Sequence, residues 1–270
     1  TERRRCTTRE DTDARAHHDH PRPNARALAP RLEIQTLGNC VCRLNGSEIT
    51  ATQWRSQRAF ELFLLILNSD NQRVARSSAS DLLWPELLGD AANNNLRVAL
   101  HRMRSALEPH QTSATIVVAD HVSIALTLPL GSKIDSDEFR HAVAAARRCV
   151  DHRAALPLLR RACDCYTGHF LETRTLPEWA IPRRAQYETD YVETALRLGG
   201  ILLAMQLHTE LHERMWRLIE LDPHNTAAVQ LLRRSYEVTG NDSMASRLDT
   251  QTPLPGVSGR TPDYRPTLSS

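Results

Sequence analysis

Lysine and glycine are scarce in this chain of 270 residues. Of the 34 cationic residues only Lys133 is a lysine, so 34 − 1 = 33 are arginines. A phosphate-binding P-loop requires the motif GK[ST], and the sequence contains no such segment. The 10 glycines are about half the usual share, which disfavours Gly-rich phosphate loops and all-β architectures. The sequence thus excludes a P-loop and most chemistry that depends on lysine.

Long apolar segments are also missing. The longest apolar run, Leu62–Leu67, is far shorter than the roughly 20 residues that a membrane span needs. The first 30 residues are rich in charge and lack the apolar core of a signal peptide. Six cysteines in a chain of this length do not indicate a disulfide framework. We therefore expect a cytoplasmic protein with reduced thiols and no membrane contact; an N-terminal Thr1 is compatible with a fragment of a longer protein.

The composition is that of a globular protein with loose ends. The chain is 41% hydrophobic and 24% charged, and its formal charge of +2 says almost nothing about partners. Charge, proline and histidine without apolar periodicity predict disorder over residues 1–30 and 250–270. Strand patterns occur in the first half of the remainder and vanish beyond residue 134. We therefore predict two domains, at 31–131 and 132–249.

The first domain begins and ends with hairpin patterns. Apolar and polar residues alternate from position 31, and Asn45-Gly46 is a strong signal for a tight turn between strands. The period changes to that of a helix near residue 55, and two further helices are predicted at about 78–84 and 92–108. Two strand-like runs around Asp120-His121 then predict a second hairpin over 115–126.

The third predicted helix has the most informative pattern. Leu96, Leu100, Met103 and Leu107 fall within about 60° of one another at 100° per residue and form a narrow buried stripe. The opposite arc carries polar and cationic side chains together with one valine, namely Asn94, Arg97, Val98, His101, Arg102 and Arg104. The helix therefore presents three arginines to solvent.

The second domain is predicted to be entirely helical. Ser136, between Asp135 and Asp137, is expected to cap the first helix. Breaks at Gly168, at Pro177 and at Asp222-Pro223 separate the helices, and Gly240 follows the last of them. The predicted helices span about 139–150, 152–167, 178–205, 208–220 and 225–239. Their similar lengths favour antiparallel helical hairpins, although no clean 34-residue repeat is present.

The order of elements in the first domain is that of a winged helix, with a strand hairpin, three helices and a wing. In such folds the third helix enters the major groove of DNA. Arginine suits bidentate contact with guanine and asparagine suits adenine, while Arg, His and helix-terminal amides also bind phosphates. The fold class predicted is thus an α+β winged helix followed by an all-α domain of tetratricopeptide-like hairpins.

Four segments carry a resemblance to a known family. Residues 79–86, ASDLLWPE, and residues 93–109, NNNLRVALHRMRSALEP, resemble the OmpR/PhoB-type winged helix, and more narrowly that of the Streptomyces antibiotic regulatory proteins. The segment DSDEF at 135–139 resembles the start of the bacterial transcriptional activator domain that follows it in this family. LDPHN at 221–225 resembles an inter-repeat turn of the same domain. The resemblance covers about residues 31–249.

This resemblance implies a transcriptional regulator, most simply an activator, that binds double-stranded promoter DNA at direct repeats. Arg97, Val98 and Arg102 would contact base edges, whereas Asn94, Asn95, His101 and Arg104 would bind phosphates or position the helix. Arg76 and Ser77 could reach a phosphate, with His121 at the wing tip. The helical domain would mediate self-association into a homo-oligomer on DNA or contact RNA polymerase. The wing departs from the family, because it lacks the Gly-Tyr pair and the arginine often found there.

Other classes of function are weighed against this one. Residues 31–130 contain nine arginines and nine acidic residues, so a helical protein-interaction module with a winged helix used for docking is the main alternative. A ligand-binding regulator cut from a larger ATPase-containing protein is a third. Cys40-x-Cys42 and Cys163-x-Cys165 lack the spacing of a zinc site, and the His17–His20 cluster, which could hold a metal ion, lies in the segment predicted to be disordered. We expect no metal, no cofactor and no enzymatic activity.

Overall fold

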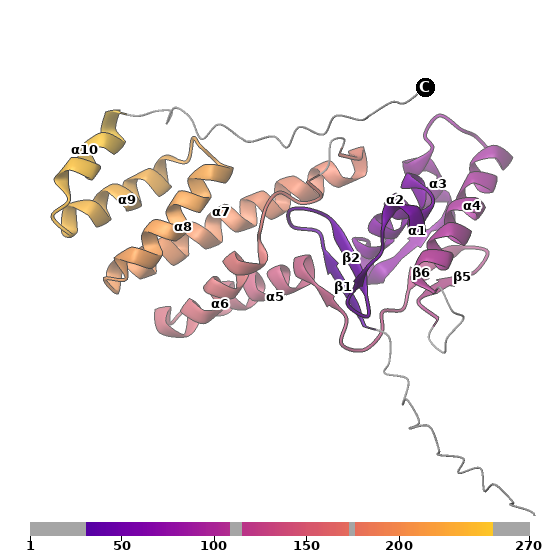
Figure 1. Cartoon of the computed structure of the whole chain (residues 1–270), viewed down its shortest axis with the longest axis horizontal. Helices are drawn as coiled ribbons and strands as arrows, with labels where there is room; N and C mark the ends of the chain where they lie inside the picture. Colours follow the sequence, from indigo (N-terminus) through magenta and orange to yellow (C-terminus); the bar gives the residue numbers. More distant parts are fainter. Residues whose placement is uncertain (1–30, 109–114, 173–175, 251–270) are drawn as a thin grey trace, which may run out of the picture.

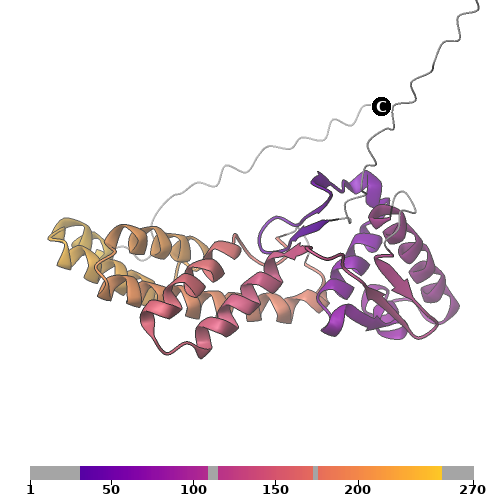
Figure 2. The ribbon, with the colours of Figure 1, turned by 90° about the horizontal axis from the view of Figure 1, so that it is seen from below.

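The computed structural model describes residues 31–108, 115–172 and 176–250. An N-terminal part built from strands and helices is followed by an array of helices, and the two parts lie end to end (Figures 1 and 2). This order confirms the predicted fold class. The segments predicted to be disordered, 1–30 and the residues beyond 250, lie outside the described residues, as does the His17–His20 cluster.

The N-terminal part contains two small sheets packed with helices. One sheet has the strand order β3-β2-β1-β7 and the other β4-β6-β5. The strands are β1 (Leu32–Gln35), β2 (Val41–Leu44), β3 (Ser47–Glu48), β4 (Arg73–Ala75), β5 (Val117–Ala119), β6 (Ser123–Leu126) and β7 (Lys133–Ile134). The helices are α1 (Ala51–Trp54), α2 (Gln57–Leu67), α3 (Arg76–Leu83) and α4 (Asp90–Leu107).

Both predicted hairpins are present. Asn45 and Gly46 join β2 to β3 with φ angles of 54° and 82°, as a type I′ turn requires. Helix α2 buries Phe63, Leu64 and Leu67 and packs against α4. The contact between the two helices forms the core of the N-terminal part. The apolar side chains buried at this contact stabilise the N-terminal part through the hydrophobic effect.

Short elements were missed or misplaced by the sequence pattern. β4 has only three residues, too few for a detectable period, and it forms because it pairs antiparallel with β6. The two-residue strand β7 likewise exists through its parallel pairing with β1. The predicted start of α3 at Ser78 is wrong, because the helix begins at Arg76 directly after β4. The four-residue helix α1 precedes the predicted first helix.

The second part is a run of helices packed as successive antiparallel pairs. Their bounds are α5 (Asp135–Arg148), α6 (His152–Cys165), α7 (Ile181–Ala204), α8 (His208–Leu221), α9 (Thr226–Val238) and α10 (Asp242–Thr250). α10 was not predicted, and Thr250, assigned to the disordered tail, is its last residue. Within the described residues, none of the helices combines the length and apolar character needed to cross a bilayer.

The predicted N-cap of α5 is wrong, and the true start of this helix explains how the two parts are joined. Ser136 lies inside the helix and is buried, while Ile134 is the N-cap. The carboxylate of Asp135 accepts hydrogen bonds from the backbone N–H groups of Thr36 (2.8 Å), Leu37 (2.8 Å) and Ser136 (2.7 Å), and from the Thr36 hydroxyl (2.9 Å). Burial raises the pKa of Asp135, and these hydrogen bonds oppose that shift.

A second set of contacts joins the segment after β1 to the α6–α7 connection. Leu37 and Phe170 form an antiparallel bridge, the Gly38 N–H donates to the carbonyl of His169 (3.0 Å), and the Leu171 N–H donates to that of Thr36 (2.8 Å). Gly38 has φ +102° and lies so close to the other segment that a Cβ would come within 2.7 Å of the hydroxyl of Thr167. A glycine is therefore required at this crossing.

We expect Asp135→Ala to lower the free energy of unfolding by about 1–3 kcal/mol, because it leaves the buried N–H groups of Thr36 and Leu37 without acceptors. Denaturant unfolding of the full chain measures this. Glu138→Ala, in the same helical turn, removes a surface ion pair at 3.6 Å with Arg161 and a long contact, at 4.0 Å, from the Cys165 thiol, and it should cost less than about 1 kcal/mol. Equal losses in the two variants would contradict the role given to Asp135.

Candidate nucleic-acid interface

Helix α4 has one buried and one exposed face. Leu96, Leu100, Met103 and Leu107 are buried, as their spacing predicts. The predicted DNA-contact residues of this helix all lie on the exposed face or at its margins. Asn94, Asn95, Arg97, Val98 and His101 are exposed, and Arg102 and Arg104 are half-buried at the two margins. Val98 is 48% exposed and lies near the middle of the face.

The cations of this face are not neutralised by neighbouring acids. Within the described part of the chain, Arg97, Arg102 and Arg104 form no ion pair. The contact recorded for Arg97 is a hydrogen bond from its Nη1 to Oδ1 of Asn94, at 3.4 Å. These guanidinium groups thus retain most of their donors for an anionic or polar partner.

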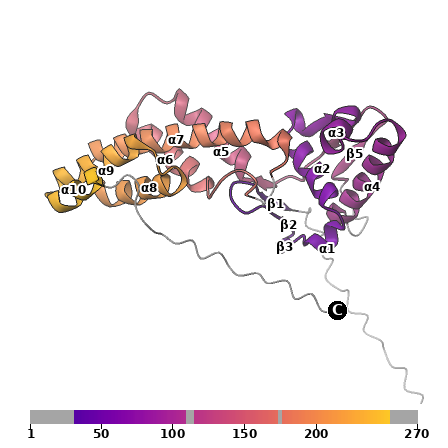
Figure 3. The ribbon, with the colours of Figure 1, turned by 90° about the horizontal axis from the view of Figure 1, so that it is seen from above.

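The exposed face lies at the free end of the molecule. In Figures 1 and 3, α4 is at the edge of the N-terminal part farthest from α8, α9 and α10. The helical array therefore does not cover the helix, and a long polymer could pass along it.

The hairpin of β5 and β6 forms the predicted wing. Its turn is held by Asp120, whose carboxylate accepts hydrogen bonds from the backbone N–H groups of Val122 and Ser123, each at 2.7 Å. The base of the wing is held by Glu108, whose carboxylate accepts from the N–H groups of Ile116 (2.7 Å) and Val117 (2.8 Å). Both acids near the wing are thus engaged by backbone donors.

The start of α3 is tied to the wing. The Arg76 N–H donates to the carbonyl of Val122 at 2.9 Å, and its Nη1 approaches the carbonyl of Asp120 at 3.5 Å. Ser77 and His121 are exposed beside these contacts. Arg73 of β4, which is not among the predicted site residues, also contacts the wing: its Nη1 donates to the Ser123 hydroxyl at 2.7 Å. No sequence signal marked it, since its place depends on the β4–β6 pairing.

The structure thus divides the ten predicted site residues into two neighbouring groups. Seven share the exposed side and margins of α4, and the other three lie at the junction of α3 with the wing: Asn94, Asn95, Arg97, Val98, His101, Arg102 and Arg104 on the helix, and Arg76, Ser77 and His121 at the junction. The individual roles of these residues stay predictions.

The cysteine pairs have the surroundings of packed thiols. Cys42 and Cys163 are buried, and burial raises the pKa of each thiol to about 12. Among residues 31–108, 115–172 and 176–250, no three His, Cys, Asp or Glu side chains are grouped so that they could hold a metal ion.

The wing should become less stable in acid. Hydrogen bonds from the Ser123 and Val122 N–H groups lower the pKa of Asp120 below its usual value of about 3.9. A carboxyl group with a lower pKa in the folded state stabilises the fold above its unfolded pKa, and this contribution is lost as the pH falls through the folded pKa. The protection of the Val122 and Ser123 amides, measured as their exchange rate relative to that of an unstructured peptide at the same pH, should decrease there, whereas Asp120→Asn should remove this loss of protection. Titration of Asp120 at or above the usual pKa would contradict this.

Comparisons with known proteins agree with this architecture. Residues 134–248 match the family of the bacterial transcriptional activator domain. No curated protein matches the chain significantly. Among solved structures, "Mycobacterium tuberculosis EmbR in complex with low affinity phosphopeptide" is similar, with a TM-score of 0.60 and 19% sequence identity. The match covers 82% of this chain and 59% of EmbR, so the present chain corresponds to little more than half of that protein.

At this identity the likeness to EmbR establishes the fold, in which a winged helix precedes an array of helices. The predicted activator domain is confirmed as a match to that family over residues 134–248, from the start of α5 into α10.

Proposed function

We propose that the protein is a bacterial transcriptional regulator that binds double-stranded promoter DNA with α4 in the major groove. The observation that carries the proposal is the exposed face of α4, which has three arginines without ion-pair partners among the described residues and lies at the free end of the molecule. An α-helix fits the major groove, where base edges present a distinct pattern for each base pair. The activator-domain family of the second part supports the same function.

The side chains of α4 match the chemistry of base edges. Arg97 and Arg102 can donate two hydrogen bonds each to guanine O6 and N7. Val98, which is apolar and exposed, suits contact with the methyl group of thymine. Asn94 lies beside Arg97 and can hold its guanidinium in an orientation directed away from the protein.

Phosphate contacts would come from both neighbouring groups. Arg104 lies at the margin of the α4 face, and Arg76, Ser77 and His121 lie at the junction with the wing. Contacts of this kind fix the register of the protein on the duplex and make binding depend on salt. Because the N-terminal part has equal numbers of arginines and acids, we expect modest non-specific affinity.

The α5–α10 array would act at a distance from the duplex. It extends from the side of the N-terminal part opposite α4 (Figure 3), so it remains open when α4 is bound. We propose that it supports self-association of copies bound at direct repeats, or contact with RNA polymerase.

A protein-interaction module remains the second candidate. The balance of nine arginines and nine acids over residues 31–130 favours it, because a DNA-binding domain usually carries a net positive charge. In that case the helical array would bind a peptide and the winged helix would serve for docking.

Substitution of the base-reading arginines should weaken specific binding. We expect Arg97→Ala and Arg102→Ala each to cost about 1–3 kcal/mol at the cognate site and to relax specificity at one position. Fluorescence anisotropy with cognate and scrambled duplexes measures both effects. Arg153→Ala, an exposed arginine on α6, is the matched control and should leave affinity unchanged. Unchanged affinity in both α4 variants would show that this is not the reading face.

Selection from random DNA tests the proposal as a whole. We expect an enriched motif in direct repeats whose centres are about 10–11 base pairs apart, because one helical turn places adjacent copies on the same side of the duplex. Sequencing of the bound pool gives motif and spacing. Absence of any enriched motif at low salt would favour the interaction module.

A further inference from the structure

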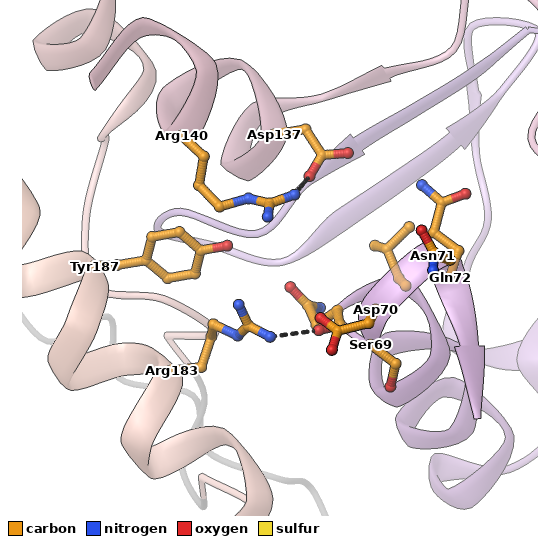
Figure 4. Close-up of a pocket in the computed structure, with 10 residues that line it drawn as sticks. Ser69, Asp70, Asn71, Gln72, Asp137, Arg140, Arg183 and Tyr187 are labelled. Carbon is orange, nitrogen blue, oxygen red and sulfur yellow. Dashed lines mark hydrogen bonds and ion pairs between the residues drawn. The ribbon is translucent and has the colours of Figure 1, made fainter. Parts of the chain in front are cut away.

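A large cavity lies between the two parts of the molecule. Its volume is about 760 Å³, and it separates the loop at residues 68–72 from the first turns of α5 and α7. Figure 4 shows Arg140 and Arg183 reaching from the two helices toward the loop, with the Tyr187 ring between them. Cavities of a few hundred cubic ångströms between domains are common sites for small molecules.

The two arginines differ in how their charge is balanced. Arg140 donates a short hydrogen bond to Asp137, one helical turn earlier on α5. Arg183 is half-buried and donates to the backbone carbonyl of Asn68 at 2.7 Å, yet within the described residues it has no carboxylate partner. A half-buried guanidinium with spare donors favours a carboxylate or phosphate.

A second cavity of about 540 Å³ adjoins the first. The two share Asn68, Ser69, Asp70 and Arg183, so Arg183 stands where they meet. The lining of the second cavity is mixed: Leu65, Leu82 and Trp179 supply apolar surface beside polar side chains that include Arg73. Leu82 is 47% exposed, which leaves apolar surface available to a ligand.

We propose that these joined cavities bind a small amphipathic organic anion. Its carboxylate or phosphate would pair with Arg183, and its apolar part would lie against Leu82 and Trp179. Asp70 is exposed at the boundary of the two cavities and has no ion-pair partner in the described part of the chain. Its negative charge disfavours a second anionic group, so the ligand has one anionic end.

The position of the cavities connects them with the proposed DNA interface. Residues 68–72 lead directly into β4, which pairs with β6 of the wing and ends at Ala75, just before Arg76 of α3. Asn71 and Gln72 have φ angles of 53° and 52°, in the left-handed region that is uncommon for residues other than glycine. A ligand that joins Arg183 to this loop would alter the orientation of the wing. This regulatory step rests on the proposed function, whereas binding itself does not.

Binding is tested on the full chain without DNA. Titration calorimetry with benzoate and with phenyl phosphate distinguishes the two anionic groups, and benzyl alcohol is the neutral control. We expect at least one anion to bind about tenfold more tightly than benzyl alcohol and to change the fluorescence of Trp179, assigned through Trp179→Phe. Equal binding of all three compounds, or none, would overturn the proposal.

Substitutions locate the site. Arg183→Ala should weaken binding of the anion about tenfold or more, whereas Arg148→Ala, an exposed arginine at the end of α5 outside the cavities, should not. Leu82→Ala, a change at an exposed position, should weaken phenyl phosphate but not inorganic phosphate, and it remains informative if Arg183→Ala unfolds the protein. Equal affinities across these variants would place the ligand elsewhere.

The regulatory step has a separate readout. If the bound anion changes the affinity for selected DNA by some factor, DNA must change the affinity for the anion by the same factor. Anion binding without any effect on DNA affinity would overturn the regulatory step alone. Failure of the chain to bind DNA at all would contradict the proposed function and leave the anion site standing.

Discussion

The carboxylate of Asp135 is the interaction on which the arrangement of the two parts depends. It is the first residue of α5, and it accepts hydrogen bonds from backbone groups of Thr36 and Leu37 just after β1. Placing a carboxylate in this half-buried position is unfavourable by itself, and several donors are needed to offset the lost hydration. These hydrogen bonds therefore restrict the position of α5 relative to the segment after β1. They fix α5, and with it the array, against the sheet of the winged helix.

A near-neutral chain can still present a cationic surface, because its acids are used elsewhere. Glu108 and Asp120 lie near α4 and the wing, but each accepts two backbone N–H groups and so serves to shape the hairpin. Asp190 and Glu193 accept from Arg147 far along the helical array. The arginines of α4 are left without such partners among the described residues. The cationic character of this surface thus depends on where the charges are placed and not on the net charge of the chain.

Sequence patterns identified what depends on local periodicity and missed what depends on tertiary pairing. The buried stripe of α4 and the turn at Asn45-Gly46 follow from side-chain spacing and backbone preference, and both are present. β4 and β7 are too short to have a period and exist through distant partners. The sequence pattern favoured Ser136 as the N-cap of α5. In the structure Asp135 is instead the first residue of this helix, and its carboxylate accepts a hydrogen bond from the Thr36 N–H. Arg73 and Arg183 were missed as site residues, because only the folded chain brings them to the wing and the cavity.

The parallel pairing of β7 with β1 has a consequence for the modularity of this protein. A cut after residue 131 would look natural in a domain map, yet it would take away the outer strand of the first sheet, the Asp135 acceptor and the segment that bridges to Leu37. The winged helix would keep the exposed face of α4 and lose the strand that closes its opposite edge. An exposed edge of this kind invites pairing with other chains. Transfer of the winged helix to another protein thus requires that the first helices of the array be included.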